Sequence, residues 1–224
     1  MKKEPKQKQY PYERYPFGRI KPYFMYTVLR PLGWLIFFCF AFRFKVVGRQ
    51  SLPKDAAGHI LVCNHLHSID PIFLVVASKR NWRFMAKKEL FRHPLSAFFI
   101  RHFNGFPVDR DVIDRKALEY SIAVLKDGRA GLGIFPEGKR SVDGVPQTAK
   151  NGVSMLARKT RASIVPASIY HEGPLKFRRR ITIRFGEVIP FEELGLGESP
   201  NARETRQASE KIMNAVTALW EQGY

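Results

Sequence analysis

From residue 45 onward, short apolar runs rich in β-branched residues alternate with longer amphipathic stretches. The short runs predict strands over 60–63, 83–86, 131–135, 163–170 and 180–185. The longer stretches predict helices over 71–78, 89–103, 115–126, 149–160 and 202–222. Strands that alternate with helices predict an α/β fold, with a largely parallel, twisted sheet flanked by helices. In such sheets ligands bind in the loops that follow the carboxyl ends of the strands.

The N-terminal part of the chain has a different pattern. Residues 1–22 are rich in Pro and Lys, and no small-residue cleavage site of a signal peptide follows the apolar stretch. The uninterrupted apolar run is 32–42, and extending it back to residue 23 reaches the roughly 20 residues of a spanning helix only by including Arg30 and Pro31. A buried core helix is the alternative. We expect residues 1–44 to form a basic leader with a membrane-associating helical segment in one leaflet, and residues 45–224 to form one folded domain.

The charge of the chain favours a polyanionic partner. There are 38 Lys and Arg against 20 Asp and Glu, a net charge of +18. Residues 1–50 contain 11 basic and two acidic residues, so their net +9 is half of that excess. Nucleic acid and an anionic membrane would both attract this charge. The aromatic residues and the apolar run of the same segment favour a membrane surface, so we expect a monotopic or peripheral protein on the cytoplasmic face of the cell membrane.

The cysteine and histidine content predicts neither a disulfide framework nor a metal site. Cys39 and Cys63 both lie in apolar stretches, which is typical of buried thiols in a reducing compartment. The sequence contains no cluster with zinc-ligand spacing.

A first candidate site follows directly on the strand predicted over 60–63. The sequence there is Asn-His-Leu-His-Ser-Ile-Asp-Pro, residues 64–71. Pro71 suits the first position of a helix, so Asp70 is expected to be its N-cap. His65 precedes Asp70 by five residues, and its imidazole could turn back to meet the carboxylate. A histidine oriented in this way can act as a general base, although this spacing alone often arises by chance.

Three further blocks lie downstream. Residues 135–141, Phe-Pro-Glu-Gly-Lys-Arg-Ser, follow the strand predicted over 131–135 and should reach the same edge of the sheet. There a glycine allows close backbone approach, and two adjacent cations offer charge. Residues 105–110, Gly-Phe-Pro-Val-Asp-Arg, add another arginine. Residues 164–167, Ile-Val-Pro-Ala, form a strand broken by proline.

The four blocks, in this order and at these intervals, resemble the 1-acylglycerol-3-phosphate acyltransferases, a family of glycerolipid acyltransferases. The family pattern is Asn-His-x4-Asp, Gly-x-x-(Phe/Pro)-(Val/Ile)-x-Arg, Phe-Pro-Glu-Gly-Thr-Arg-Ser and a Val-Pro block. The resemblance covers about residues 45–190. Lys139 stands where the family usually has Thr, which we expect to affect the choice of acceptor more than the reaction.

The resemblance implies a role for each matching residue. His65 corresponds to the general base, and Asp70 to the carboxylate that orients it. The acceptor's glycerol phosphate would be bound by Arg110, Glu137, Gly138 and Arg140, with Lys139 adding a cation. The Val165-Pro166 block would lie on the acyl side of the pocket. Ser68 and Ser141 are expected to be structural or to bind substrate, because the implied mechanism forms no acyl-enzyme.

The implied reaction moves a fatty acyl group onto the sn-2 hydroxyl of lysophosphatidate, a lysophospholipid, and gives phosphatidate. The co-substrate would be acyl-CoA or acyl-carrier protein, with no cofactor and no metal. The acceptor could instead be another lysolipid or an amine-bearing lipid, since the motif would look the same. A basic nucleic-acid-binding protein is the other alternative, but it would leave the four blocks unexplained, so no nucleic-acid partner is expected.

Overall fold

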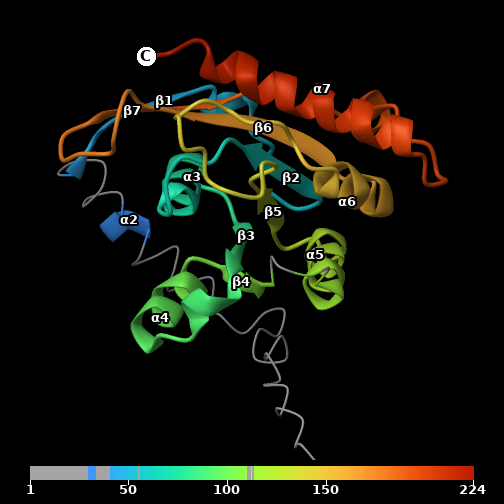
Figure 1. The fold of residues 1–224 in the computed structure, drawn as a ribbon, viewed down its shortest axis with the longest axis horizontal. Helices are drawn as coiled ribbons and strands as arrows, with labels where there is room; N and C mark the ends of the chain where they lie inside the picture. The colour runs from blue at the N-terminus through green and yellow to red at the C-terminus, as the bar shows by residue number, and fades with distance from the viewer. Residues whose placement is uncertain (1–29, 34–40, 55, 110–111, 113) are drawn as a thin grey trace, which may run out of the picture.

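The structure is a computed structural model that describes residues 30–33, 41–54, 56–109, 112 and 114–224 (Figure 1). Within these residues, the chain forms one seven-stranded sheet in the order β1-β7-β6-β2-β5-β3-β4. The strands are β1 (Arg43–Val47), β2 (His59–Cys63), β3 (Trp82–Lys87), β4 (Gly105–Val108), β5 (Gly131–Ile134), β6 (Ser163–Tyr170) and β7 (Arg180–Phe185). Every neighbouring pair is parallel except β6 and β7, which are antiparallel. The predicted α/β fold with a largely parallel sheet is confirmed.

Helices cover both faces of the sheet (Figure 1). The α-helices are α2 (Arg30–Gly33), α3 (Asp70–Ser78), α4 (Pro94–His102), α5 (Arg115–Asp127), α6 (Gly152–Thr160) and α7 (Ala202–Trp220), and the 3-10 turns are η4 (Arg49–Ser51), η5 (Lys88–Phe91) and η6 (Phe191–Leu194). Side chains from α5, α6 and α7 form one core cluster with Ile60 and Val62. Side chains from α3 form the other with Leu61 and Cys63. Alternate residues of β2 therefore enter opposite cores, which explains why this strand is apolar throughout.

The five predicted strands are present, but β1 and β4 were not predicted. β1 alternates exposed and half-buried residues at one edge of the sheet, so its pattern is only weakly apolar. β4 has four residues and contains Pro107, which an edge strand tolerates because one side of its backbone has no neighbour to bond. The edges of this sheet are thus the part that hydrophobic patterning misses.

The helix predicted over 89–103 is wrong in its first part. Residues Lys88–Phe91 form the 3-10 turn η5, and α4 begins only at Pro94. His93 has an extended backbone, with φ −87° and ψ 125°. Proline disfavours helical geometry in the residue before it, so the helix restarts at Pro94 instead of running through.

The structure covers little of the predicted membrane-associating segment. Most of the segment 1–44 lies outside the described residues, although β1 already begins at Arg43. None of the helices that the structure describes is both long and apolar enough to cross a bilayer.

Cys63 is a free thiol and 1% exposed, as predicted for a buried cysteine. Burial raises the pKa of its thiol, and the carboxylates of Asp70 and Glu137 raise it further. Cys39 lies outside the described residues.

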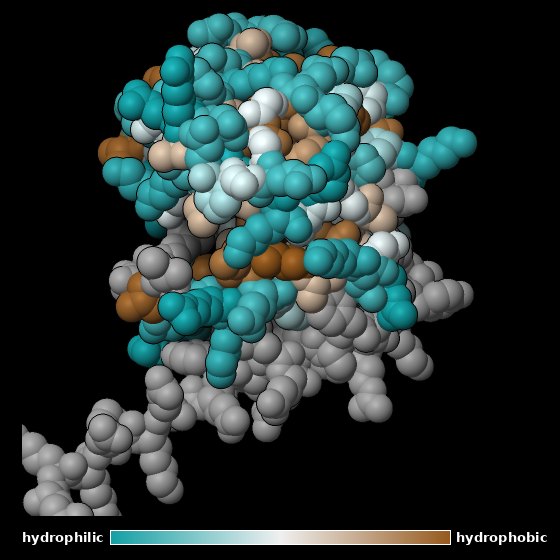
Figure 2. Space-filling model, turned by 90° about the vertical axis from the view of Figure 1, so that its right-hand side faces the viewer, coloured by the Kyte–Doolittle hydropathy of each residue, from teal (hydrophilic) through white to brown (hydrophobic). Residues whose placement is uncertain are grey.

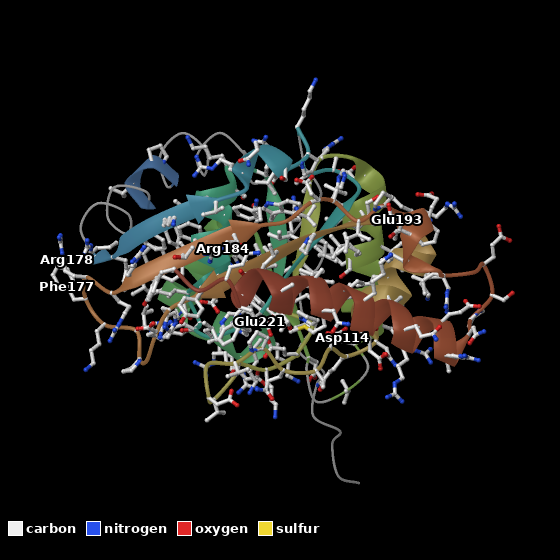
Figure 3. All side chains as sticks on the ribbon, turned by 90° about the horizontal axis from the view of Figure 1, so that it is seen from above. Asp114, Phe177, Arg178, Arg184, Glu193 and Glu221 are labelled. Atoms are coloured by element: carbon white, nitrogen blue, oxygen red, sulfur yellow. The ribbon has the colours of Figure 1, made fainter. Side chains whose placement is uncertain are left out.

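The C-terminal helix is fixed across the sheet by a buried cation. Figure 3 looks down on α7, which lies along the sheet beside Arg184 of β7. The Arg184 guanidinium donates to the carbonyl oxygens of Gly223 at 2.5 Å and Gln222 at 3.4 Å. Arg184 is 5% exposed, so these charge-assisted bonds lie in a water-poor setting and hold the end of the chain against the strand.

Candidate active site

The carboxyl ends of β2 and β5 bring the two longest sequence blocks together. The strands are parallel neighbours, with Val62 opposite Ile134. The turn over 64–70 follows β2 and the loop over 135–148 follows β5, so both leave the sheet at the same edge. The predicted placement of the His-Asp block beside the Glu-Gly-Lys-Arg block is confirmed.

His65 and Asp70 form a buried pair. Nδ1 of His65 lies 2.9 Å from Oδ2 of Asp70, and the two residues are 7% and 0% exposed. Since a carboxylate only accepts, Nδ1 carries the hydrogen and donates it. In the neutral imidazole, Nε2 is then the basic nitrogen, and no hydrogen bond joins it to any other residue that the structure describes. The geometry is that of a histidine prepared to take a proton at Nε2.

Asp70 does not cap α3, so that prediction is wrong. The N-cap is Ile69, and Asp70 is the first residue of the helix. Besides the imidazole, Oδ2 accepts the backbone N–H groups of Leu66 at 2.7 Å and His67 at 2.8 Å. All three donors lie on the turn before the helix, which draws the carboxylate back toward His65. Asp70 thus organises the turn as well as the imidazole.

The backbone of His65 is held from the other block. Its N–H donates to Oε1 of Glu137 at 2.9 Å, and its carbonyl oxygen accepts the N–H of Ser141 at 2.8 Å. The imidazole stacks on the Phe135 ring, with centroids 4.0 Å apart and planes 17° from parallel. The two blocks therefore position one side chain together.

Asn64 is a residue that sequence reasoning left without a role. Its side-chain amide donates to the carbonyl oxygen of Ile169 and its Oδ1 accepts the N–H of Ile169, both at 2.9 Å. This paired bond ties the end of β2 to β6 and sets where the His65 turn begins. The residues are 105 positions apart, so no local signal announces the contact.

Glu137 is turned into the protein. It is 3% exposed, and burial raises the pKa of its carboxyl group to about 7, although the backbone N–H groups of His65 and Gln147 oppose the rise. The resemblance implied contact with the acceptor's glycerol phosphate, whereas the contact seen here is with the His65 backbone. Glu137 is thus a positioning residue for His65 in this structure.

We expect Glu137→Gln to remove a pH dependence of stability. Between pH 4.5 and about 7 the folded chain keeps a proton on Glu137 that the unfolded chain has released. The free energy of unfolding should therefore fall as the pH rises through this window, by on the order of 3 kcal/mol in all. The amide of Gln still accepts the His65 N–H but cannot ionise. Urea unfolding at pH 5 and pH 8 should show a smaller loss in Glu137→Gln than in wild type, and exposed Glu198→Gln is the matched control.

A small cavity opens beside the imidazole. It has a volume of about 180 Å³ and is lined by His65, Met85, Val108, Gly133, Ile134, Phe135, Gly138 and Lys150. Gly138 has φ +71°, and a Cβ there would lie 2.9 Å from Nζ of Lys150. The left-handed backbone is what favours glycine here, since the flexible end of the Lys150 side chain could move aside for a Cβ. The lining thus combines apolar side chains with the imidazole of His65 and the cation of Lys150.

Lys150 is a cation of this site that sequence reasoning missed. The sequence pattern assigned it to a helix over 149–160, but α6 begins at Gly152. Its backbone N–H donates to the carbonyl oxygen of Pro136 at 2.9 Å, which fixes it to the loop that carries Glu137 and Gly138. No local sequence pattern marks Lys150 out from the other lysines. It is identified because it lines the cavity together with Gly138, which lies 12 positions earlier in the chain.

The other predicted residues do not line this cavity or lie outside the described residues. Lys139 and Arg140 are exposed directly after Gly138, and no hydrogen bond or ion pair links them to other described residues. Arg110 falls outside the described residues. Oγ of Ser141 donates to Asp143 at 2.7 Å. Among the residues that the structure describes, no group of three His, Cys, Asp or Glu side chains could hold a metal.

The His67 ring is not part of the imidazole–carboxylate pair. Its Nδ1 accepts the N–H of Ile69 at 3.4 Å, and no hydrogen bond joins the ring to Asp70, to which only the backbone N–H of His67 donates. It lines a different cavity of about 700 Å³ together with Ser141 and His171. The two histidines of the turn thus face different spaces, which supports His65 over His67 as the base.

Comparison with known proteins points to one family. The family model described as "Acyltransferase" matches residues 43–170. The 1-acyl-sn-glycerol-3-phosphate acyltransferase of Streptococcus pneumoniae is 30% identical over 175 residues, which cover 75% of this chain and 64% of that protein. The protein of the same name from Bacillus subtilis is 35% identical over 131 residues, which cover 58% of this chain and 63% of that one. The chain thus covers less than two thirds of either relative.

A solved structure agrees with these relatives. The 1-acyl-sn-glycerophosphate acyltransferase of Thermotoga maritima matches with a TM-score of 0.64 and 27% identity, covering 87% of this chain and 78% of that one. The family match spans both the His65–Asp70 turn and the Glu137 loop. The His-Asp pair, the interlocked loops and the match over more than half of its length establish that this chain belongs to the acyltransferase family.

Proposed function

We propose that the protein transfers a fatty acyl group from acyl-CoA or acyl-carrier protein to the sn-2 hydroxyl of lysophosphatidate, giving phosphatidate. The observation that carries this proposal is the buried His65–Asp70 pair. Asp70 holds Nδ1 of His65, which leaves Nε2 as the basic nitrogen, and His65 lines the cavity. The names of the bacterial relatives and of the Thermotoga maritima structure support lysophosphatidate as the acceptor.

In the proposed reaction, Nε2 of His65 removes the proton from the acceptor hydroxyl while the hydroxyl oxygen attacks the thioester carbonyl carbon. Asp70 stabilises the imidazolium that forms, because its carboxylate lies 2.9 Å from Nδ1. When the tetrahedral intermediate collapses, the C–S bond breaks and the thiolate takes the proton from Nε2. The thiolate is a good leaving group, since a thiol has a pKa of about 8.5.

The proposed mechanism forms no acyl-enzyme. Ser141 is engaged with Asp143, and Ser68 is exposed on the turn. Neither side chain has the hydrogen bond to His65 that an activated serine nucleophile needs. Direct transfer also requires only the acyl donor as a co-substrate.

The acceptor's phosphate would be bound by the cations around Gly138. Lys150 lines the cavity, and Lys139 and Arg140 are the two exposed residues that follow Gly138 in the chain. Arginine can bind two phosphate oxygens at once, whereas each lysine acts more as a point charge. We also propose that Arg110 joins this group, as the resemblance implies, and that residues 1–44 hold the protein at an anionic, cytoplasmic membrane surface.

An assay of the purified protein tests the proposal. Acyl-CoA and acyl-carrier protein would each be offered with a panel of lysolipids in anionic or zwitterionic vesicles, and products identified by mass spectrometry. We expect phosphatidate from lysophosphatidate, with faster initial rates on the anionic vesicles. Preferred acylation of an unphosphorylated, amine-bearing or other lysolipid would contradict the proposed acceptor, and equal rates on both vesicle types would contradict the proposed surface.

A further inference from the structure

Exposed apolar side chains gather on α4 and the turn before it. Of the eleven large hydrophobic residues that are exposed in the described part of the chain, four lie between positions 90 and 99. They are Leu90, Leu95, Phe98 and Phe99, with exposed fractions of 47%, 60%, 47% and 46%. We refer to these four residues as the α4 patch. Scattered exposed hydrophobics are ordinary, but a contiguous group marks a contact surface.

The helix presents this patch because its other face is already used. Ala97 is 4% exposed, and a Cβ on Gly105 would lie 2.4 Å from Cγ2 of Ile100, so Ala97 and Ile100 face the sheet through β4. Leu95, Phe98 and Phe99 have the spacing i, i+3 and i+4, which places them together on the opposite face. Packing on β4 therefore fixes the outward direction of the patch.

The patch lies next to the strands that line the cavity. α4 connects β3 to β4 and lies beside β4, apart from α6 and α7 (Figure 1). Met85 of β3 and Val108 of β4 line the cavity together with His65. A lipid surface in contact with α4 would thus adjoin the strands that supply these two apolar residues to the cavity.

The charge around the patch fits an anionic surface. Residues 87–103 contain Lys87, Lys88, Arg92 and Arg101 against Glu89, a net charge of +3, which the ion pair of Lys88 with Asp109 reduces to +2. Arg92 is exposed at the approach to α4. Apolar and aromatic residues on one helix face beside basic residues are typical of helices that lie in the interface of a bilayer. By contrast, the face shown in Figure 2 is mostly hydrophilic, with hydrophobic atoms gathered in a band low on it.

We propose that the α4 patch is a membrane-contact surface of the folded domain, separate from residues 1–44, and that it docks on a bilayer containing anionic lipids beside the cavity. The occupant is a lipid surface because the patch joins apolar area to positive charge next to β3 and β4, the strands that supply Met85 and Val108 to the cavity. Docking there would let a lipid acceptor enter the site without crossing water. This last consequence rests on the proposed function, but the docking itself does not.

The test measures vesicle binding with the full chain. Leu95→Gln/Phe99→Gln removes apolar area, and Gln has a helix propensity as good as that of the residues it replaces. Met155→Gln likewise replaces an exposed apolar side chain by Gln, on α6, which lies well apart from α4; Met155 is 46% exposed. On vesicles of phosphatidylglycerol and phosphatidylcholine, the double variant should need about tenfold more lipid for half-maximal co-sedimentation. Met155→Gln should bind like wild type.

Unchanged lipid binding of the double variant would overturn the proposal. If that variant also melted at a lower temperature, the patch would be covered by protein instead of lipid. A second variant, Phe99→Trp, keeps the apolar character and reports contact directly. Its fluorescence should be quenched by brominated lipids beyond the quenching of the wild-type tryptophans, and equal quenching would likewise overturn the proposal. Because neither readout uses acyl transfer, failure of the proposed reaction would not be mistaken for failure of docking.

Discussion

His65→Ala should lower kcat by about 10²–10⁴-fold, the contribution usual for a general base. The variant keeps the backbone N–H that donates to Glu137 and the carbonyl that accepts from Ser141, so the turn should stay folded. His67→Ala is the matched control. It removes an imidazole from the same turn, but one that makes no hydrogen bond to Asp70. Its backbone N–H, which donates to Asp70, is retained. The measurement is kcat at saturating donor and acceptor.

Asp70→Asn should cause a loss of similar size for a different reason. The amide oxygen can still accept the N–H groups of Leu66 and His67, but the neutral side chain cannot stabilise an imidazolium. Because Oδ1 of Asp70 is buried with no partner among the described residues, an amide NH2 there costs about 1–3 kcal/mol of stability. Melting temperatures separate that cost from the catalytic loss. Near-normal turnover would mean that Asp70 only organises the turn.

The double variant His65→Ala/Asp70→Asn adds a stricter comparison. If Asp70 acts through the imidazole, removing it after His65 is gone should cost little more, so the two losses should not add. Multiplied losses would show that Asp70 supports catalysis independently of His65.

Arg140→Ala should weaken the use of lysophosphatidate about ten- to more than a hundredfold in kcat/KM, while sparing an unphosphorylated monoacylglycerol. A charge-assisted hydrogen bond contributes about 1.5–3 kcal/mol, and only the phosphorylated acceptor can form it. Arg140 is exposed next to Gly138, so its removal should not disturb the core. Arg203→Ala, an exposed arginine on α7, makes the same change in net charge elsewhere.

The ratio of kcat/KM for the two acceptors decides this prediction. Equal losses on both acceptors would assign Arg140 to the fold or to the donor. Lys139→Thr, which installs the residue usual in the family, should change KM modestly and leave kcat intact, since an exposed point charge adds attraction without fixing geometry.

The sequence by itself determined the five inner strands of the sheet, their alternation with helices, and the meeting of the two main blocks. Apolar runs such as 60–63 encode burial locally, because a strand covered on both faces needs hydrophobic residues throughout. Parallel strands then bring the loops after β2 and β5 to one edge. The His65–Asp70 pair was predictable because the two residues are only five positions apart on a single turn.

Only the tertiary structure decided how that pair is supported. Glu137 and Asn64 reach partners 72 and 105 positions away, and such hydrogen bonds leave no trace in local periodicity. Asp is a preferred N-cap residue, but the Asp70 carboxylate accepts hydrogen bonds from three groups of the preceding turn and does not cap the helix. Lys150 enters the site, and the α4 patch faces outward, because the packing of other elements fixes where those residues point. Local pattern thus determines which residues are buried, while contacts between distant segments determine what the buried and exposed polar groups can do.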